Sequence, residues 1–198
     1  MHQNLATMRT FLFVFSLFFS LQALAQKECV FATNIKDSIG TYKETKDYMM
    51  HEKNFGGKST YLFFSLINND GTPLLKVQKI VKSADFIEAN CFDQQSKIYL
   101  QLQNGKIVTL VYGAQDTCGN LLRLEDQKLS TRVISGNFLF LKGSIEDLQN
   151  SPISIIRIKF TTESADFVVK KELVSELMNE TFSPETYFMT YLHCVTDN

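Results

Sequence analysis

Hydrophobic and polar residues alternate along much of the chain with the period of two that is typical of half-buried β-strands. The alternation is clear in residues 59–67 and 74–81, which the turn-forming sequence Asn68-Asn69-Asp70-Gly71 separates. Pro73 has no N–H to give to a strand ladder, so it suits the beginning of the second strand. We therefore predict that these two segments form a β-hairpin.

A second hairpin is predicted by Asn104-Gly105, which joins the alternating segments 96–103 and 106–112. If Asn104 and Gly105 are a two-residue loop, Gln103 faces Lys106 across the hairpin. In that register one apolar face gathers residues from both strands, namely Ile98, Leu100, Leu102, Ile107, Thr109 and Val111.

Three later segments, 137–141, 153–161 and 165–170, also have the composition of strands. In the middle one Ile156, Ile158 and Phe160 would face the core, while Arg157 and Lys159 would face outward. Between the first two, Ser144-Ile145-Glu146-Asp147 fits the capping-box pattern of a short helix that continues through Leu148.

The end of the chain predicts a helix instead of a strand. Ser183 is a favourable N-cap and Pro184 a favourable first helical residue. Apolar side chains then recur at helical spacing on one stripe: Tyr187, Phe188, Tyr191, Leu192, Cys194 and Val195. Many short strands with two helices predict a mainly β domain, either an antiparallel β-sandwich-like fold or a β-rich α+β fold with a short internal helix and a C-terminal helix.

The first residues have the three parts of an export signal. Arg9 precedes an apolar run, Phe11 to Leu21, and Ala23-Leu24-Ala25 is a small-x-small cleavage site. We predict a signal peptide over residues 1–25, a single secreted domain over 26–198, and a periplasmic or extracellular location. The apolar run of about eleven residues is too short for a membrane span, which needs roughly twenty.

All four cysteines, Cys29, Cys91, Cys118 and Cys194, follow the predicted cleavage site, and an even number in an exported chain favours disulfides. The register of the Asn104-Gly105 hairpin pairs Cys91 with Cys118, unless a bulge, for example at Gly113, shifts it. Cys29 and Cys194 then remain, and this is one of three possible connectivities. Cys29 lies three residues past Gln26, whereas lipid attachment needs a cysteine at the cleavage point, so we expect no lipid anchor.

Charge and motifs exclude several classes of function. The chain has 20 basic and 21 acidic residues, and removal of Arg9 leaves a net charge of −2, which argues against nucleic acid as a partner. The sequence GGKST at 56–60 lacks the first glycine of a phosphate-binding P-loop and reads as a turn into a strand. Asn68-Asn69-Asp70-Gly71 lacks the alternating ligands of a calcium loop.

We predict no catalytic, cofactor-binding or metal-binding residue. After cleavage only His51 and His193 remain, and His193 would point about 100° away from its neighbour Cys194 on an ideal helix. The cysteine spacings contain no C-x-x-C, so they give no support to a zinc site. Carboxylates are scattered, with Glu44, Asp47, Glu52, Glu146 and Asp147 as examples, and no local spacing gathers them.

Three segments, Cys91 to Leu110, Phe138 to Thr162 and Pro184 to Cys194, together with Gln26 at the expected start, resemble an uncharacterised family of small secreted Bacteroidetes proteins of the flavobacteria type. That family has no known activity, so the resemblance implies a compartment and no site residue. Asp37-Ser38-Ile39 is similar to the O-glycosylation acceptor of such exported proteins, and Asn179-Glu180-Thr181 is an N-glycosylation sequon if the source is eukaryotic.

Two classes of function remain. The first is an exported, non-catalytic domain that binds a protein, a glycan or another component of the cell envelope, with no membrane span, no nucleic acid and no cofactor. The absence of a recognisable catalytic set, the aromatic-rich strands and the predicted disulfides favour it. The alternative is a secreted hydrolase whose carboxylates come from separate strands.

Overall fold

A computed structural model describes residues 27–124 and 129–196. The predicted signal peptide, residues 1–25, lies outside the described residues. The strands are β1 (Phe31–Lys36), β2 (Thr41–Thr45), β3 (Tyr48–Phe55), β4 (Lys58–Asn69), β5 (Thr72–Ser83), β6 (Cys91–Phe92), β7 (Lys97–Leu102), β8 (Ile107–Tyr112), β9 (Thr117–Cys118), β10 (Asn120–Leu124), β11 (Leu129–Phe140), β12 (Ile153–Lys159), β13 (Ser164–Val168), β14 (Leu173–Ser175) and β15 (Glu180–Phe182). The helices are α2 (Ser144–Asn150), the 3₁₀ turn η2 (Pro184–Thr186), α3 (Tyr187–Tyr191) and α4 (His193–Thr196).

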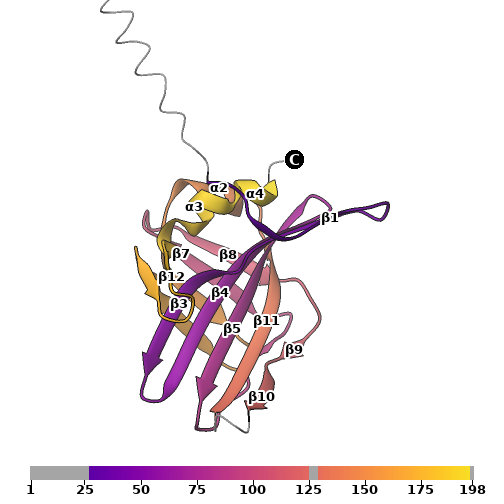
Figure 1. Ribbon diagram of the computed structural model, residues 1–198. Coiled ribbons are helices and arrows are strands. Elements are labelled where there is room, and N and C mark those ends of the chain that lie inside the picture. The colour runs from indigo at the N-terminus through magenta and orange to yellow at the C-terminus, as the bar shows by residue number, and fades with distance from the viewer. Residues whose placement is uncertain (1–26, 125–128, 197–198) are drawn as a thin grey trace, which may run out of the picture.

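The fold is mainly β and its strand pairs are antiparallel, as predicted. One large sheet has the order β1-β2-β4-β5-β11-β8-β7-β12-β13, with β3 also on β4 and β10 also on β11. The sheet bends where β11 meets β8, so that β7, β8 and β12 lie behind β3, β4, β5 and β11 (Figure 1). The result is a sandwich-like arrangement with the main core between the two layers.

The β4–β5 hairpin is the longest paired element and confirms the first predicted hairpin. Asn69 pairs with Thr72, and the two residues between them, Asp70 and Gly71, have φ of 49° and 80°. Positive φ at both positions is the geometry of a type I′ two-residue hairpin turn, and Asp-Gly supplies it at low cost. The twelve residues of β4 then align with the twelve of β5 without a bulge.

Strand β4 is buried on both faces, which the sequence prediction of a half-buried strand did not include. Leu62, Phe64 and Leu66 point into the main core between the layers. Tyr61 and Phe63 point to the other side and form a second cluster, which is completed by Met49 of β3, Leu173 of β14 and Phe182 of β15. The β14–β15 hairpin therefore covers the outer face of β3 and β4.

Aromatic rings fill one end of the main core. Phe92 stacks on Phe160 with ring centroids 5.2 Å apart, and it also contacts Phe138 at 5.2 Å and Tyr112 at 5.4 Å. Gly136 of β11 faces these rings, and a Cβ atom there would lie 2.7 Å from the ring of Phe92. The absence of a side chain at Gly136 therefore makes room for the aromatic cluster.

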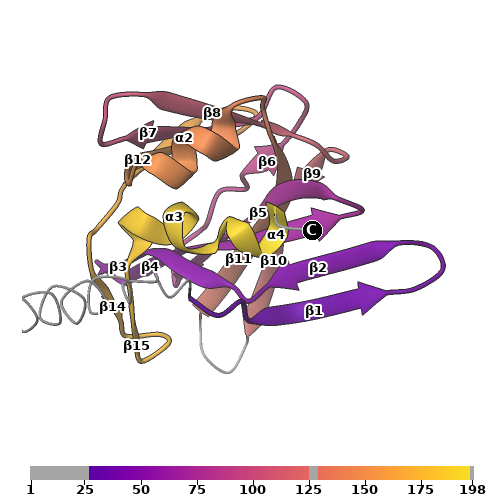
Figure 2. The same cartoon turned by 90° about the horizontal axis from the view of Figure 1, so that it is seen from above.

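The helices gather at one end of the two layers, as the view from above shows (Figure 2). Both predicted helices exist, and the internal one begins one residue earlier than predicted. Gly143, with φ of 84°, is the N-cap of α2, the position at which the capping-box pattern placed Ser144. The helix begins one residue before the predicted start because glycine readily adopts the left-handed conformation that Gly143 has.

The C-terminal helix is broken into η2, α3 and α4. Ser183 precedes η2 as predicted, but its backbone carbonyl, not its hydroxyl, accepts the Thr186 N–H at 3.2 Å. The predicted apolar stripe is buried all the same, with Tyr191 only partly covered.

The predicted register of the Asn104-Gly105 hairpin is wrong by one residue. Gln101 pairs with Ile107, and the Leu102 N–H donates to the Lys106 carbonyl at 2.8 Å, so the loop has three residues and not two. Gly105 has φ of 86° and completes the longer loop. As a consequence Val108 and Leu110 face the core, while Ile107, which was predicted to face the core, is 64% exposed.

Both predicted disulfides are nevertheless present, Cys91–Cys118 and Cys29–Cys194. Beyond the hairpin, the Tyr112 N–H donates to the Ser96 carbonyl, and the next two residues that face each other are Phe92 and Thr117. Three residues, 93–95, thus oppose four residues, 113–116, which gives the second strand one extra residue. This extra residue cancels the shift from the longer loop, so Cys91 still faces Cys118.

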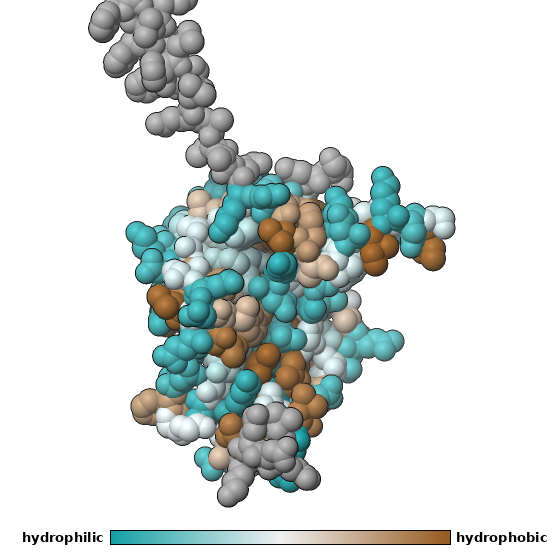
Figure 3. Space-filling view, viewed as in Figure 1, coloured by the Kyte–Doolittle hydropathy of each residue, from teal (hydrophilic) through white to brown (hydrophobic). Residues whose placement is uncertain are grey.

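The β1–β2 hairpin projects from the body of the molecule, and its outer end carries hydrophobic atoms among polar ones (Figure 3). Ile39, in the Asp37-Ser38-Ile39 sequence at its tip, is 91% exposed. The space-filling view also shows hydrophobic atoms on the lower part of the same face. Among the described residues, no helix has the length and apolar character that a membrane crossing needs.

The corrected register gives a test by paired substitutions. We expect Val108→Ala to lower the free energy of unfolding by about 1–3 kcal/mol, because it removes buried methyl groups, whereas Ile107→Ala should leave it nearly unchanged. Urea unfolding followed by circular dichroism measures both. A larger loss for Ile107→Ala than for Val108→Ala would contradict the three-residue loop.

Candidate functional site

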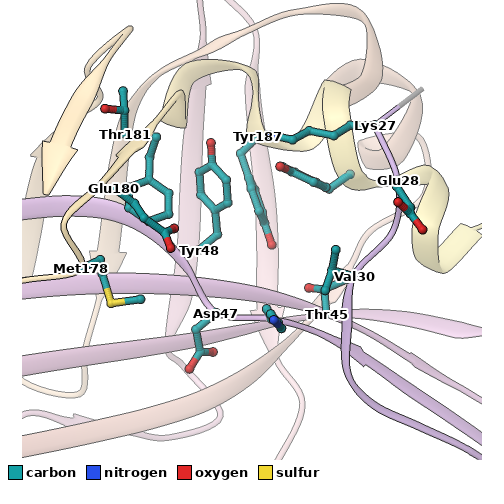
Figure 4. A pocket seen from close by; sticks show the side chains of 13 residues that line it. Lys27, Glu28, Val30, Thr45, Asp47, Tyr48, Met178, Glu180, Thr181 and Tyr187 are labelled. Atoms are coloured by element: carbon teal, nitrogen blue, oxygen red, sulfur yellow. The ribbon is translucent and has the colours of Figure 1, made fainter. Parts of the chain in front are cut away.

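A cavity of about 400 Å³ lies where the N-terminal segment, the junction of β2 and β3, and the C-terminal segment meet. Its lining comes from residues 27–30, 45–48 and 178–191, which are far apart in the sequence: Lys27, Glu28, Val30, Thr45, Lys46, Asp47, Tyr48, Met178, Glu180, Thr181, Phe182, Tyr187 and Tyr191. Figure 4 shows Tyr48 and Tyr187 side by side, with Lys27 reaching in from one side, Glu180 on the other and Asp47 below Tyr48.

The cavity exists because the ladder on β4 is interrupted between β2 and β3. Glu44 pairs with Ile67 and Tyr48 pairs with Phe64, but the backbone between them leaves β4. The Leu66 N–H instead donates to the Thr45 hydroxyl at 2.9 Å, and the Lys46 N–H donates to the Val30 carbonyl at 3.2 Å. The N-terminal segment is thereby held over the break, and a hollow remains below it.

Three tyrosines form one wall of this cavity. The ring centroids of Tyr48 and Tyr187 are 4.9 Å apart, those of Tyr48 and Tyr191 are 5.4 Å apart, and those of Tyr187 and Tyr191 are 5.5 Å apart. Phe182 extends the wall with an edge contact to Tyr48 at 5.0 Å. We call Tyr48, Tyr187 and Tyr191 the tyrosine wall.

The hydroxyl groups of the tyrosine wall differ in their partners. The Tyr48 hydroxyl accepts the Ser183 N–H at 2.7 Å. The Tyr187 hydroxyl is buried and has no hydrogen-bond partner among the described residues; the Thr45 hydroxyl approaches it without reaching hydrogen-bond geometry. Burial raises the pKa of Tyr187, so this hydroxyl stays protonated and keeps its donor.

Charged side chains surround the opening. The Lys27 ammonium lies 5.6 Å from the centroid of the Tyr191 ring, and its hydrogen bond with Tyr191 raises the pKa of Lys27. Glu28, Asp47 and Glu180 line the same cavity and are exposed to solvent. The cavity therefore combines an aromatic surface with a rim of both charges.

Other carboxylates named from the sequence do not join this cavity. Glu52 accepts a hydrogen bond from the Ser175 hydroxyl at 2.5 Å, and Asp147 pairs with Lys106 at 2.5 Å.

The GGKST sequence at 56–60 forms the predicted turn into a strand. Gly56 and Gly57 connect β3 to β4, so this sequence forms no phosphate-binding loop. The sequon Asn179-Glu180-Thr181 lies at the cavity, since Glu180 and Thr181 line it.

Glu44 belongs to a separate network on the outer face of the sheet. It accepts hydrogen bonds from the Lys76 ammonium at 2.6 Å, the Tyr42 hydroxyl at 2.8 Å and the Ser65 hydroxyl at 3.3 Å. Burial by itself raises the pKa of Glu44, but these bonds outweigh burial, and the pKa lies below its usual range. Burial and the bond to Glu44 raise the pKa of Tyr42 to about 12.

The two histidines lie in different surroundings. Burial, with Lys170 and Lys53 nearby, lowers the pKa of His51, whose ring packs against Phe167 at 5.1 Å between β3 and β13. The expectation that His193 and Cys194 point apart is wrong, because His193 Nε2 lies 3.6 Å from Cys194 Sγ and 3.2 Å from Cys29 Sγ. The chain is not one regular helix there, since α3 ends at Tyr191 and α4 begins at His193.

Sequence reasoning placed Tyr187 and Tyr191 on a buried stripe but did not identify the cavity. Its other lining residues, Lys27, Tyr48 and Phe182 among them, carry no local motif. Comparisons with protein-family models, with curated proteins and with solved structures found no match for the chain.

The unpartnered hydroxyl of the tyrosine wall can be tested by deletion. We expect Tyr187→Phe to leave the free energy of unfolding unchanged or to raise it by up to about 1 kcal/mol, because it removes a buried group that has no partner. The matched change Tyr48→Phe should lower it by about 1 kcal/mol, because the Ser183 N–H loses its acceptor. Chemical unfolding measures both. A clear loss in Tyr187→Phe would show that the hydroxyl has a partner.

The Glu44 network predicts a pH dependence of stability. A carboxyl with a lowered folded pKa stabilises the fold fully above its unfolded pKa of about 4.3 and loses this contribution as the pH falls through the folded value. We expect Glu44→Gln to lower the free energy of unfolding by about 1–3 kcal/mol near pH 7 and to flatten its fall in acid. Asp166→Asn is the comparison: its bonds with Arg157 also lower the pKa of Asp166, but this pair is exposed, so we expect a smaller effect on stability and on its fall in acid. Unfolding curves across the acid range would decide, and equal slopes in wild type and Glu44→Gln would contradict the assignment.

Proposed function

We propose that the chain is an exported, non-catalytic domain that binds a glycan in the cavity beside the tyrosine wall. The observation that carries this proposal is the combination of Tyr48 and Tyr191, both only partly buried, with exposed charged side chains around one opening. A sugar ring has an apolar face of C–H groups and a rim of hydroxyls. Aromatic rings match the face, and carboxylates and ammonium groups match the rim.

Export is part of this proposal. Two disulfides within the described residues are compatible with an oxidising compartment, and all four cysteines follow the predicted cleavage site. A periplasmic or extracellular domain meets envelope polysaccharides. The resemblance to small secreted Bacteroidetes proteins supports the same compartment.

The hydrolase alternative has one observation in its favour, which is that Glu28, Asp47 and Glu180 line the same cavity. A glycosidase needs one carboxylic acid that is protonated near neutral pH, and burial in an apolar pocket is the usual cause. All three of these side chains are exposed. Binding without hydrolysis therefore fits the cavity better.

The test is a glycan array that includes bacterial envelope polysaccharides, followed by calorimetric titration with the glycans it selects. We expect saturable binding that Tyr191→Ala weakens at least tenfold, which corresponds to about 1.4 kcal/mol. Tyr99→Ala is the matched control, because Tyr99 is also a partly buried tyrosine but lines a different hollow of the surface.

Three results would contradict the proposal. One is glycan binding that Tyr191→Ala and Tyr99→Ala affect equally. Another is cleavage of the bound glycan that Glu180→Gln abolishes, which would establish the hydrolase instead. The third is that no glycan on the array binds, while a protein from envelope extracts binds the wild type and not Tyr191→Ala. The ligand would then be a protein.

A further inference from the structure

Three potential metal ligands converge where the N-terminal segment meets α4. The Sγ atoms of Cys29 and Cys194 and the Nε2 atom of His193 all lie within 4.8 Å of one another. Within residues 27–124 and 129–196, this is the one group of three such side chains whose ligand atoms come so close. Two thiolates and an imidazole are the ligand types that Zn²⁺ prefers.

In the structure the two sulfurs are joined as a disulfide, so this set is available only after reduction. The nitrogen is already well placed. His193 Nε2 lies 3.2 Å from Cys29 Sγ and 3.6 Å from Cys194 Sγ. Zn–S and Zn–N bonds of about 2.3 and 2.0–2.1 Å at a tetrahedral angle put sulfur and nitrogen ~3.6 Å apart. Only the two sulfurs would have to separate, to ~3.8 Å by the same geometry.

The three residues are held close together by contacts that do not involve the S–S bond. The buried side chains of Leu192, just before α4, and of Val195 on α4 flank His193 and Cys194, and the Asn68 side-chain amide donates to the Val195 carbonyl at 2.6 Å. Next to Cys29, the Val30 carbonyl accepts the Lys46 N–H. The Cα atoms of Cys29 and Cys194 are 5.6 Å apart, so opening the bond leaves both thiols beside His193.

We propose that Cys29, His193 and Cys194 form a Zn²⁺ site when a dithiol reduces their disulfide. In this exchange the two thiols of the reductant become a disulfide, and Cys29 and Cys194 become thiols. Zn²⁺ then binds both sulfurs and displaces their two protons, while neutral His193 gives the third bond. The fourth position is left for water, as in a zinc site with three protein ligands.

The site is accessible and adjoins the tyrosine wall without depending on the proposed function. Cys29 and His193 are partly exposed, whereas Cys194 lies behind them at 6% exposure. Cys29 stands between Glu28 and Val30, which line the cavity. A zinc ion would hold this segment to α4 in the same place as the disulfide, so the cavity keeps its wall in both redox states.

The experiment uses Co²⁺ as a spectroscopic substitute for Zn²⁺. The variant Cys91→Ser/Cys118→Ser keeps only the proposed cysteines. This variant is reduced with a dithiol, and the dithiol is then removed by gel filtration under nitrogen. The reduced protein is titrated with Co²⁺. We expect one Co²⁺ per chain with sulfur-to-metal charge-transfer absorption, displaced by Zn²⁺. The oxidised protein should show none, and the variant Cys29→Ser/Cys194→Ser should show none after reduction.

The role of the imidazole is tested with a matched pair. We expect His193→Ala to weaken Zn²⁺ binding at least tenfold and His51→Ala to leave it unchanged. If the reduced chain loses its structure, Zn²⁺ should restore the native circular dichroism and raise the melting temperature. Reduced protein that binds no ion and is not stabilised by Zn²⁺ overturns the proposal, as does binding that His193→Ala and His51→Ala affect equally.

Discussion

Strand β4 buries eight consecutive side chains, Tyr61 to Asn68, and the rest of the molecule is arranged around the need to cover both of its faces. Burying each large apolar side chain contributes about 1.5–3 kcal/mol, so neither face can stay open to water. The bend of the sheet covers the inner face with the second layer. The β14–β15 hairpin covers the outer face with Leu173 and Phe182.

The position of the cavity follows from these two coverings. After β15 the chain must cross from the outer face of β4 to the helical end of the core, and η2, α3 and α4 make that crossing. Tyr187 faces the main core from one side and the cavity from the other. The interruption between β2 and β3, at Thr45 to Tyr48, lines the same cavity as Tyr187. The cavity therefore lies between the parts of the chain that cover the two faces of β4, and the Cys29–Cys194 disulfide joins the N-terminal segment beside it to α4.

The sequence predicted those parts of the fold whose cause is local. Asp70-Gly71 determines a two-residue turn because both residues tolerate positive φ, and the β4–β5 hairpin follows from it. Asn104-Gly105 does not determine its loop, because a glycine with φ of 86° fits a three-residue loop as well, and the register was missed by one residue. The start of α2 also has a local cause, the positive φ of Gly143, but the capping-box pattern at Ser144 pointed to the next residue. The cavity depends on contacts between residues as far apart as Lys27 and Tyr191, which no spacing reveals.

Evolution of this chain is constrained by two single-residue features. They are the third residue of the loop at Gly105 and the extra residue in the segment 113–116. Each shifts the pairing by one position, and together they bring Cys91 opposite Cys118. A deletion in either place alone would turn one cysteine to the other side of its strand. In relatives, an insertion or deletion in one of these two segments should therefore be accompanied by a compensating one in the other, so that the two lengths change together.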